Sequence, residues 1–227
     1  MIRTGYIALE IDGSYRRDRR DSADVPQAIM TQIIEFETQR LRLRQWRPAD
    51  REPFARLNAD ARVMEFFPAS LDRATSDALA ERLETQIAER GWGFWAVDIL
   101  GGEDFIGFVG LHVPVPDIPC SPYVDVGWRL AFRHWGQGYA TEAARGALRV
   151  GFELLDLPEI VAFTALQNRR SRTVMERLQM RETGEIFEHP NVPVGHPLRV
   201  HCLYRLSRER WQNEPDRSSL RWIRGGR

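Results

Sequence analysis

The chain has 227 residues, of which 43% are hydrophobic and 28% charged, and its 32 lysines and arginines balance 32 acidic residues. This length is enough for one substantial core or two small domains of ordinary globular composition. The zero net charge argues against a protein that binds nucleic acid or anionic membranes non-specifically, because such binding needs a positive excess.

Cysteine content and the distribution of apolar residues bear on location. Cys120 and Cys202 are the two cysteines, too few for a disulfide framework, which suits a reducing cytoplasm. The sequence has no run near the roughly 20 apolar residues of a membrane span, and residues 1–20 lack the apolar block of a signal peptide. We therefore expect a cytoplasmic protein without a membrane partner.

Residues 1–35 differ from the rest of the chain, because neither a helical nor a strand periodicity persists there. We predict a flexible N-terminal extension, or a start-site artefact in which Met30 is the first residue. An arm that docks on RNA or on a ribosome is the alternative, but Asp18, Asp21 and Asp24 offset the nearby arginines.

The regular part of the pattern begins near Phe36. Leucines and arginines alternate over residues 40–44, which predicts a half-buried strand. Asp50 can cap a helix that is apolar at positions 54 and 57. A second helix, apolar at positions 79, 83 and 87, ends at Gly91.

A hairpin and a further strand follow. Residues 94–100 and 105–111 form two strands around a Gly-Gly turn. The prolines of residues 114–122 exclude a central strand and predict a loop. Residues 123–130 then form a strand that leads into a short glycine loop.

The helix after that loop carries an apolar stripe that includes Leu154 and Leu155, and Pro158 bars its continuation. Residues 160–166 predict another strand, and Asn168 can cap the helix that follows.

The C-terminal part is less regular. A short strand after Glu185 and a last strand over residues 201–206 complete the domain. Residues 207–227 are polar, with Trp211 and Trp222 as isolated anchors, and we expect a loose tail.

The most informative stretch is Arg133-His-Trp-Gly-Gln-Gly-Tyr-Ala140, which continues directly into Thr141. Gly136 and Gly138 permit a positive φ or the close approach of a ligand. The helix that starts here directs unpaired N–H groups into the loop, which suits an anion such as a pyrophosphate. A strand-to-helix turn without a ligand is the alternative.

Five motifs occur in a fixed order: Glu37-Thr-Gln-Arg-Leu-Arg-Leu-Arg44, Asp125-Val-Gly-Trp128, Arg133-x-x-Gly-x-Gly138, Ala140-Thr-Glu-Ala143 and Asn168-x-x-Ser171. Together they resemble the GNAT acetyltransferases over about residues 36–206, and most of all the ribosomal-protein N-acetyltransferases (RimJ/RimL-like). The joint pattern is specific for the fold and for acetyl-CoA but says little about the acceptor.

The resemblance implies a mixed α/β fold, in which a splayed, mostly antiparallel sheet of about six to seven strands has helices on both faces. We divide the chain into an extension (1–35), an acetyltransferase domain (36–206) and a tail (207–227). Acetyl-CoA is expected where two neighbouring strands part. The residues expected to bind acetyl-CoA are Arg133, Gly136, Gln137, Gly138, Tyr139, Ala140, Thr141, Asn168 and Ser171.

Acetyl transfer to an amine needs a base, an oxyanion donor and a proton for the departing thiolate. Asp125 is the candidate base, acting through a water, or is a carboxylate on a solvated strand face. The resemblance suggests that Ser171 meets the thiol and returns the proton, with Tyr204 as a second candidate. Asn168 binds the pantetheine arm or only caps its helix. A backbone N–H near Val126 is expected to stabilise the oxyanion.

Two departures from the family pattern have physical consequences. A glycine usually follows the Asn-x-x-Ser helix, whereas here Gln179 must take the helix-ending geometry, at a cost of about 1 kcal/mol. The acidic residue before the strand glycine is often glutamate. Asp125 is one methylene shorter, which argues against direct proton abstraction.

A weak base favours an acceptor whose amine needs little help. An α-amine with a pKa of about 8 is roughly one-tenth unprotonated at pH 7, whereas a lysine near a pKa of about 10.4 is almost fully protonated. We therefore expect a protein N-terminal amine, followed by a small amine such as an amino sugar, a polyamine or an amino acid. Phe66, Phe67 and Trp95 form either an acceptor pocket wall or core. A non-catalytic acetyl-CoA-binding scaffold is the alternative from another class.

A metal site is not expected. His189, His196 and His201 are spaced by seven and five residues, which does not place them on one helical face. Neither cysteine has an activating partner in sequence, so the amine is expected to attack directly in a ternary complex. Whether the chain forms a homodimer is a question that the sequence leaves open.

Overall fold

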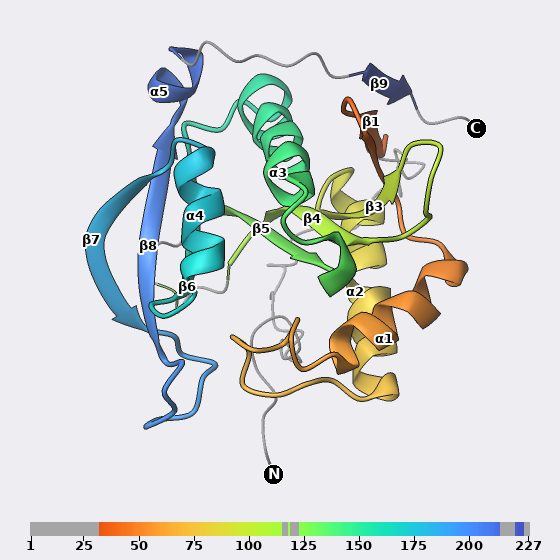
Figure 1. Cartoon of the computed structure of the whole chain (residues 1–227). Helices are drawn as coiled ribbons and strands as arrows, with labels where there is room; N and C mark the ends of the chain where they lie inside the picture. Colours follow the sequence, from red (N-terminus) through yellow and green to blue (C-terminus); the bar gives the residue numbers. More distant parts are fainter. Residues whose placement is uncertain (1–31, 115–117, 119–122, 214–220, 225–227) are drawn as a thin grey trace, which may run out of the picture.

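Nine strands form one open sheet in the computed structural model, which describes residues 32–114, 118, 123–213 and 221–224 (Figure 1). Their order across the sheet is β7-β8-β6-β5-β4-β3-β2-β1-β9. Neighbouring strands are antiparallel except β5 and β6, which are parallel. The strands are β1 (Ile34–Glu37), β2 (Leu41–Arg44), β3 (Phe94–Ile99), β4 (Gly107–His112), β5 (Val124–Leu130), β6 (Glu159–Ala165), β7 (Arg181–Glu188), β8 (Val200–Ser207) and β9 (Arg221–Arg224).

Helices join the strands and cover the sheet. In Figure 1, α3 and α4 lie side by side, and α1 and α2 pack against each other in a separate layer. Among the α-helices, α3 follows β5 in the chain and α4 follows β6. The helical segments are η1 (Pro48–Asp50), α1 (Arg51–Ala59), α2 (Arg73–Arg90), η2 (Phe132–His134), α3 (Tyr139–Arg149), η3 (Val150–Leu154), α4 (Arg169–Arg177) and α5 (Arg208–Gln212).

Successive aromatic residues of β3 point to opposite faces of the sheet, as the strand period of two requires. Trp95 packs edge-on against Phe36 at 5.3 Å, and a side chain at Gly146 of α3 would meet Phe36 at 2.5 Å. On the other face, Phe94 joins a group of aromatic rings beneath α1, formed by Trp46, Phe54, Phe105 and Phe108. The sheet is therefore buried on both sides, which confirms the expected mixed α/β class.

The strand number exceeds the expected six to seven, because β1 and β9 add two strands at one edge. β9 pairs with β1 from Ile34↔Arg224 to Glu37↔Arg221. The expected loose tail therefore needs correction in its described part, which contains α5 and β9. Its two tryptophans explain why: Trp211 stacks on Phe152 at 5.5 Å, and Trp222 packs against Phe36 at 5.9 Å.

Asp50 precedes α1 as expected, but its carboxylate does not cap the helix. It accepts hydrogen bonds from Arg44 Nη1 at 2.7 Å and Nη2 at 2.9 Å, while Arg44 Nε donates to Asp98 at 2.6 Å. Burial would lower the pKa of Arg44, yet the two carboxylates hold that pKa above its ordinary value. Arg44 is therefore buried and paired with two carboxylates, which the alternating pattern over residues 40–44 does not indicate.

The helix after the glycine loop changes to a π turn, η3, at its end. Leu155 N–H donates to Val150 O at 3.0 Å, five residues back. The extra residue rotates the side chains, so that Phe152 is buried while Leu154 is 50% exposed. The predicted stripe through Leu154 is wrong for this reason.

The end of α4 confirms the geometry predicted for Gln179, whose φ is 61°. Gln179 N–H donates to Glu176 O at 2.9 Å, and Met180 N–H donates to Met175 O at 3.0 Å. These two bonds form a Schellman motif, in which a non-glycine residue occupies the left-handed position.

β5 and β6 lie parallel but part after two register pairs, Val124↔Ile160 and Asp125↔Val161. β5 continues to Leu130 along β4, and β6 continues to Ala165 along β8. The sheet therefore opens directly after Asp125, as the resemblance implied.

Three expectations concern residues outside the described ones. They are the flexible extension over residues 1–31 with Met30 as an alternative start, most of the proline-rich loop over residues 114–122, and the state of Cys120. Among the described residues, no helix combines the length and apolar character needed to cross a bilayer.

Candidate active site

The glycine loop places a helix N-terminus at the opening between β5 and β6. Gly136 and Gly138 have φ values of 75° and 82°, and Gly138 directly precedes α3. Because first-turn N–H groups have no intrahelical acceptor, those of Tyr139 and Ala140 remain available. The described residues also offer no partner for the buried Thr141 Oγ1. Such a set of donors suits an acceptor-rich anionic ligand.

Arg40, the residue directly before β2, binds this loop through its side chain. Its Nη1 donates to Gln137 O at 3.0 Å, its Nε donates to Glu142 at 2.6 Å, and its guanidinium lies 4.6 Å from the centre of the Tyr139 ring. Thr38 Oγ1 donates to the same Glu142 carboxylate at 2.6 Å. Two motifs about a hundred residues apart in sequence therefore form one structural unit.

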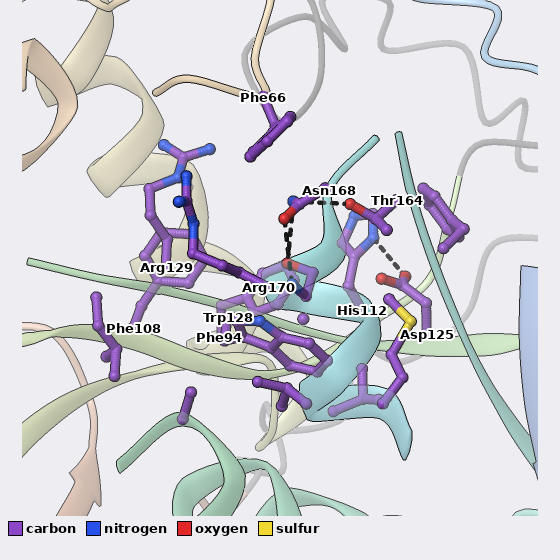
Figure 2. A pocket seen from close by; sticks show the side chains of 18 of the residues that line it. Phe66, Phe94, Phe108, His112, Asp125, Trp128, Arg129, Thr164, Asn168 and Arg170 are labelled. Carbon is purple, nitrogen blue, oxygen red and sulfur yellow. Dashed lines mark hydrogen bonds and ion pairs between the residues drawn. The ribbon is translucent and has the colours of Figure 1, made fainter. Parts of the chain in front are cut away.

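A cavity of about 530 Å³ lies beside the loop and collects residues from distant parts of the chain (Figure 2). Its lining includes Gly136 and residues 138–141, together with Asp125, Asn168 and Ser171. Phe66 and Phe67 also line the cavity, which agrees with the alternative that they form a pocket wall. Trp95 is instead fully buried in the core. The structure thus brings most of the predicted site residues together.

Arg133 and Gln137 are predicted site residues that do not line this cavity. Arg133 follows the strand in η2 and turns outward to Glu103, with Nε 3.2 Å from Oε2. Gln137 Nε2 donates to Arg133 O at 3.1 Å. Both side chains therefore support the loop from outside, and the structure lends no support to a direct cofactor contact by Arg133.

Asp125 faces His112 across the β4–β5 pair, where the two residues are register partners. His112 Nδ1 lies 3.0 Å from Asp125 Oδ1, and both side chains line the cavity (Figure 2). Since a carboxylate accepts, Nδ1 carries the hydrogen and Nε2 is left as the basic nitrogen. Sequence reasoning missed His112, and the signal that could have found it is the antiparallel register of the hairpin strand with β5.

Asn168 caps α4, as predicted: its Oδ1 accepts from Ser171 N–H at 3.1 Å. Its Nδ2 donates to Thr164 Oγ1 at 3.0 Å and to Ser171 Oγ at 3.1 Å (Figure 2). Because Ser171 Oγ already accepts a bond, its own hydroxyl hydrogen remains to be donated into the cavity.

Tyr204, the second candidate proton donor, does not line the cavity. It is 1% exposed, and its hydroxyl accepts from Arg172 Nε at 3.2 Å. Burial raises the pKa of this phenol, although Arg172 works in the opposite direction. The geometry therefore favours Ser171 over Tyr204.

Two buried histidines also line the cavity. The rings of His189 and His201 lie 5.0 Å apart, and burial lowers the pKa of His189 to about 3 and that of His201 to about 4. Among the described residues, no group of three or more metal-ligating side chains comes together. Both rings are therefore neutral wall residues at physiological pH.

The charged lining of the cavity is mainly basic. Among the described residues that line it, Asp125 is the one with a carboxylate. The guanidinium groups come from Arg82, Arg129, Arg170 and Arg177. Of these, Arg170 pairs with Glu65 outside the lining set and lies over the Phe66 and Trp135 rings. Four guanidinium groups and one carboxylate from the described part of the chain therefore line the cavity, and Glu65 pairs with one of the four.

The chain is similar to known proteins over most of its length. The family described as "Acetyltransferase (GNAT) domain" matches residues 40–181. The FsC-acetyl coenzyme A-N(2)-transacetylase of Aspergillus fumigatus is 33% identical over 139 residues, which span 59% of this chain and 58% of that protein. The uncharacterized N-acetyltransferase YnaD of Bacillus subtilis is 26% identical over 186 residues, spanning 78% of this chain and 99% of that protein.

A solved structure shares the fold at lower identity. The spermidine N-acetyltransferase of Vibrio cholerae, in complex with CoA and spermine, superposes with a TM-score of 0.60 and is 20% identical. The match covers 76% of this chain and 98% of that one.

Proposed function

Because the chain belongs to the GNAT acetyltransferase domain family, we propose that it transfers the acetyl group of acetyl-CoA to a primary amine by direct attack in a ternary complex. The observation that carries this proposal is the opening between β5 and β6. It places the α3 N-terminus, Asp125 and Ser171 around one cavity.

Acetyl-CoA fits the donors of the glycine loop. The first-turn N–H groups of α3 bind its pyrophosphate, and the buried Thr141 Oγ1, which lacks a protein partner in the described structure, gains one there. The pantetheine arm then follows the gap between the parted strands toward Asn168 and Ser171. These assignments keep the predicted contacts except the side chains of Arg133 and Gln137.

His112 and Asp125 together supply the base. Asp125 holds the imidazole so that Nε2 accepts the proton of the attacking amine, directly or through a water. This arrangement resolves the difficulty of the short aspartate, because the imidazole provides the reach that Asp125 lacks.

Ser171 is the proton donor for the departing thiolate. Its hydroxyl hydrogen, left over after Asn168 Nδ2 bonds its oxygen, is donated to the sulfur as the thioester breaks. A backbone N–H near Val126, at the point where the sheet opens, stabilises the oxyanion.

The acceptor was expected to be a protein N-terminus because Asp125 alone is a weak base, and the ribosomal-protein branch would act on such an acceptor. His112 removes that premise, because the imidazole that Asp125 orients is the group that accepts the proton. The preference for a protein N-terminus over a small amine therefore no longer follows from the base, and both stay candidate acceptors.

The proposal is tested by mixing purified protein with acetyl-CoA and panels of amines and peptides, and by following thiol release and acetylated product. We expect an acetyl-CoA-dependent melting shift and turnover with at least one amine. A melting shift without transfer to any amine would establish the non-catalytic scaffold instead. Absence of both would refute acetyl-CoA binding itself.

A further inference from the structure

Arg129 is the one arginine of the cavity wall that belongs to β5, two residues beyond Gly127. It is 5% exposed and pairs in register with Phe108 of β4. Its guanidinium lies 4.2 Å from the Phe67 ring centre and 5.3 Å from that of Phe108. Two aromatic faces therefore hold this cation in place.

One neutral side chain fixes the direction of the guanidinium. Arg129 Nη1 donates to Asn58 Oδ1 at 2.6 Å, and Asn58 Nδ2 donates to Ser76 Oγ at 2.8 Å. Asn58 and Ser76 are both fully buried. Since the amide is committed at both ends, it presents its oxygen to Arg129 and anchors β5 to α1 and α2.

Arg129 lacks a counterion in the described structure. None of its ion pairs or hydrogen bonds there involves a carboxylate, and its Nε is buried without any partner. Burial alone lowers the pKa of Arg129, to about 9, so the group remains a cation at neutral pH. Arg44 is the contrast within the same fold, because two carboxylates meet it. A buried charge without a counterion is costly, so an anion from outside would be strongly favoured here.

The position of Arg129 assigns this anion to the acceptor rather than to acetyl-CoA. Asp125, Gly127 and Arg129 alternate along β5 and point to one face, the face covered by α1 and α2. The pyrophosphate donors belong to α3, on the opposite face. The α carbons of Asp125 and Arg129 are about 13 Å apart along the strand, and Figure 2 shows the two side chains at opposite sides of the cavity.

We propose, on the basis of the acetyltransferase function above, that the acceptor is a small primary amine carrying a carboxylate, and that Arg129 binds this carboxylate. The amine then lies at the His112–Asp125 end, and the acid group reaches the guanidinium between Phe67 and Phe108. The carboxylate would meet the Nη donors that Asn58 leaves unused, and a small rotation of the guanidinium would bring in the buried Nε to complete a planar fork of two hydrogen bonds.

This acceptor class differs from a polyamine. A polyamine is a multiple cation and would need carboxylates at its distal amines, whereas the distal end of this cavity presents Arg129. The likeness to the spermidine enzyme, at 20% identity, shows the fold alone.

The test compares acceptors matched in every respect except the acid group. Glycine, β-alanine, 4-aminobutyrate, 6-aminohexanoate and several L-amino acids are each assayed beside their carboxamides, with spermidine as a further arm. We expect kcat/KM to favour at least one carboxylate over its amide by about tenfold or more, which is about 1.4 kcal/mol. Equal or better use of the amides, or a preference for spermidine, would overturn the inference and leave the acetyltransferase function intact.

Three variants locate the preference. Arg129→Met should reduce the carboxylate-to-amide ratio to about one, and Arg129→Lys should retain part of it. Arg56→Met removes an exposed arginine from α1, the helix that supplies Asn58, and should keep the full ratio. Because the ratio compares two substrates of the same preparation, a loss of folded protein cannot mimic the result. An unchanged ratio in Arg129→Met would refute the role of Arg129.

A binding measurement separates this inference from the proposed function. Thermal unfolding is recorded with the same amino acids and amides in the absence of acetyl-CoA. We expect the carboxylates to raise the melting temperature of the wild type but not of Arg129→Met. If no amine is acetylated, this shift would still support the anion site, and its absence would overturn it.

Discussion

His112 Nδ1 lies 3.0 Å from Asp125 Oδ1, and the Phe94 ring stacks on the imidazole at 5.5 Å. The stacking and the ion-pair geometry leave the imidazole one orientation, with Nε2 directed away from the carboxylate. The pair therefore resembles the base-and-orienter arrangement found in many enzymes that activate a nucleophile.

Removing the imidazole should abolish most of the catalytic step. His112→Ala is expected to lower kcat by about 10²- to 10⁴-fold, the range of a general base, while the Kd for acetyl-CoA stays the same. Asp125→Asn should lower kcat less, because it orients the base without accepting the proton. Steady-state kinetics and calorimetry measure both. A larger loss in Asp125→Asn than in His112→Ala would return the role of base to Asp125.

Thr141→Val tests the coenzyme site. The Oγ1 atom is buried and unsatisfied in the described structure, so its removal should leave the free protein as stable or more stable. The same change should weaken acetyl-CoA binding by about 0.5–1.5 kcal/mol, the net contribution of one hydrogen bond. Opposite changes in melting temperature and in affinity would be hard to explain by misfolding. Unaltered affinity would mean that the hydroxyl does not meet the coenzyme.

Gln179→Gly should stabilise the fold by about 1 kcal/mol. Gln179 holds a φ of 61° inside the Schellman motif, where glycine avoids the steric cost of a β-carbon. Gln179→Ala is the matched control and should give no such gain, because alanine keeps the β-carbon. Urea unfolding at pH 7 distinguishes the two, and an equal gain in both variants would contradict the backbone explanation.

Stability should fall in mild acid because of His189 and His201. Burial lowers their pKa values from 6.5 to about 3 and about 4, so below pH 6.5 the unfolded chain binds protons that the native state does not. The free energy of unfolding should then decrease by about 1.4 kcal/mol per pH unit for each histidine, until the native pKa values are reached.

Above pH 7 these groups should contribute no slope, since both states are neutral there. Urea titrations between pH 7 and pH 5 measure the effect, and His189→Gln should remove about half of the slope that the pair contributes. An unchanged slope in this variant would show that other groups cause the acid sensitivity.

Features that depend on short-range geometry were predictable from the sequence. The Gly136 and Gly138 turn, the Asn168 cap, the stop at Gly91 and the left-handed Gln179 each follow from the backbone preferences of one residue and its neighbours. Features that depend on packing were less predictable. Leu154 is exposed because a π turn shifts the helical phase, and β9 forms where Trp222 packs against Phe36.

The sequence by itself determined the acetyltransferase family, the glycine loop and the candidate residues on either side of it, because each of those motifs is contiguous in the chain. Only the tertiary structure decided that Arg133 points away, that His112 lies beside Asp125, and that Arg129 has no counterion among the described residues. Strand register and burial set these relationships between distant residues, and both arise when the whole sheet is assembled.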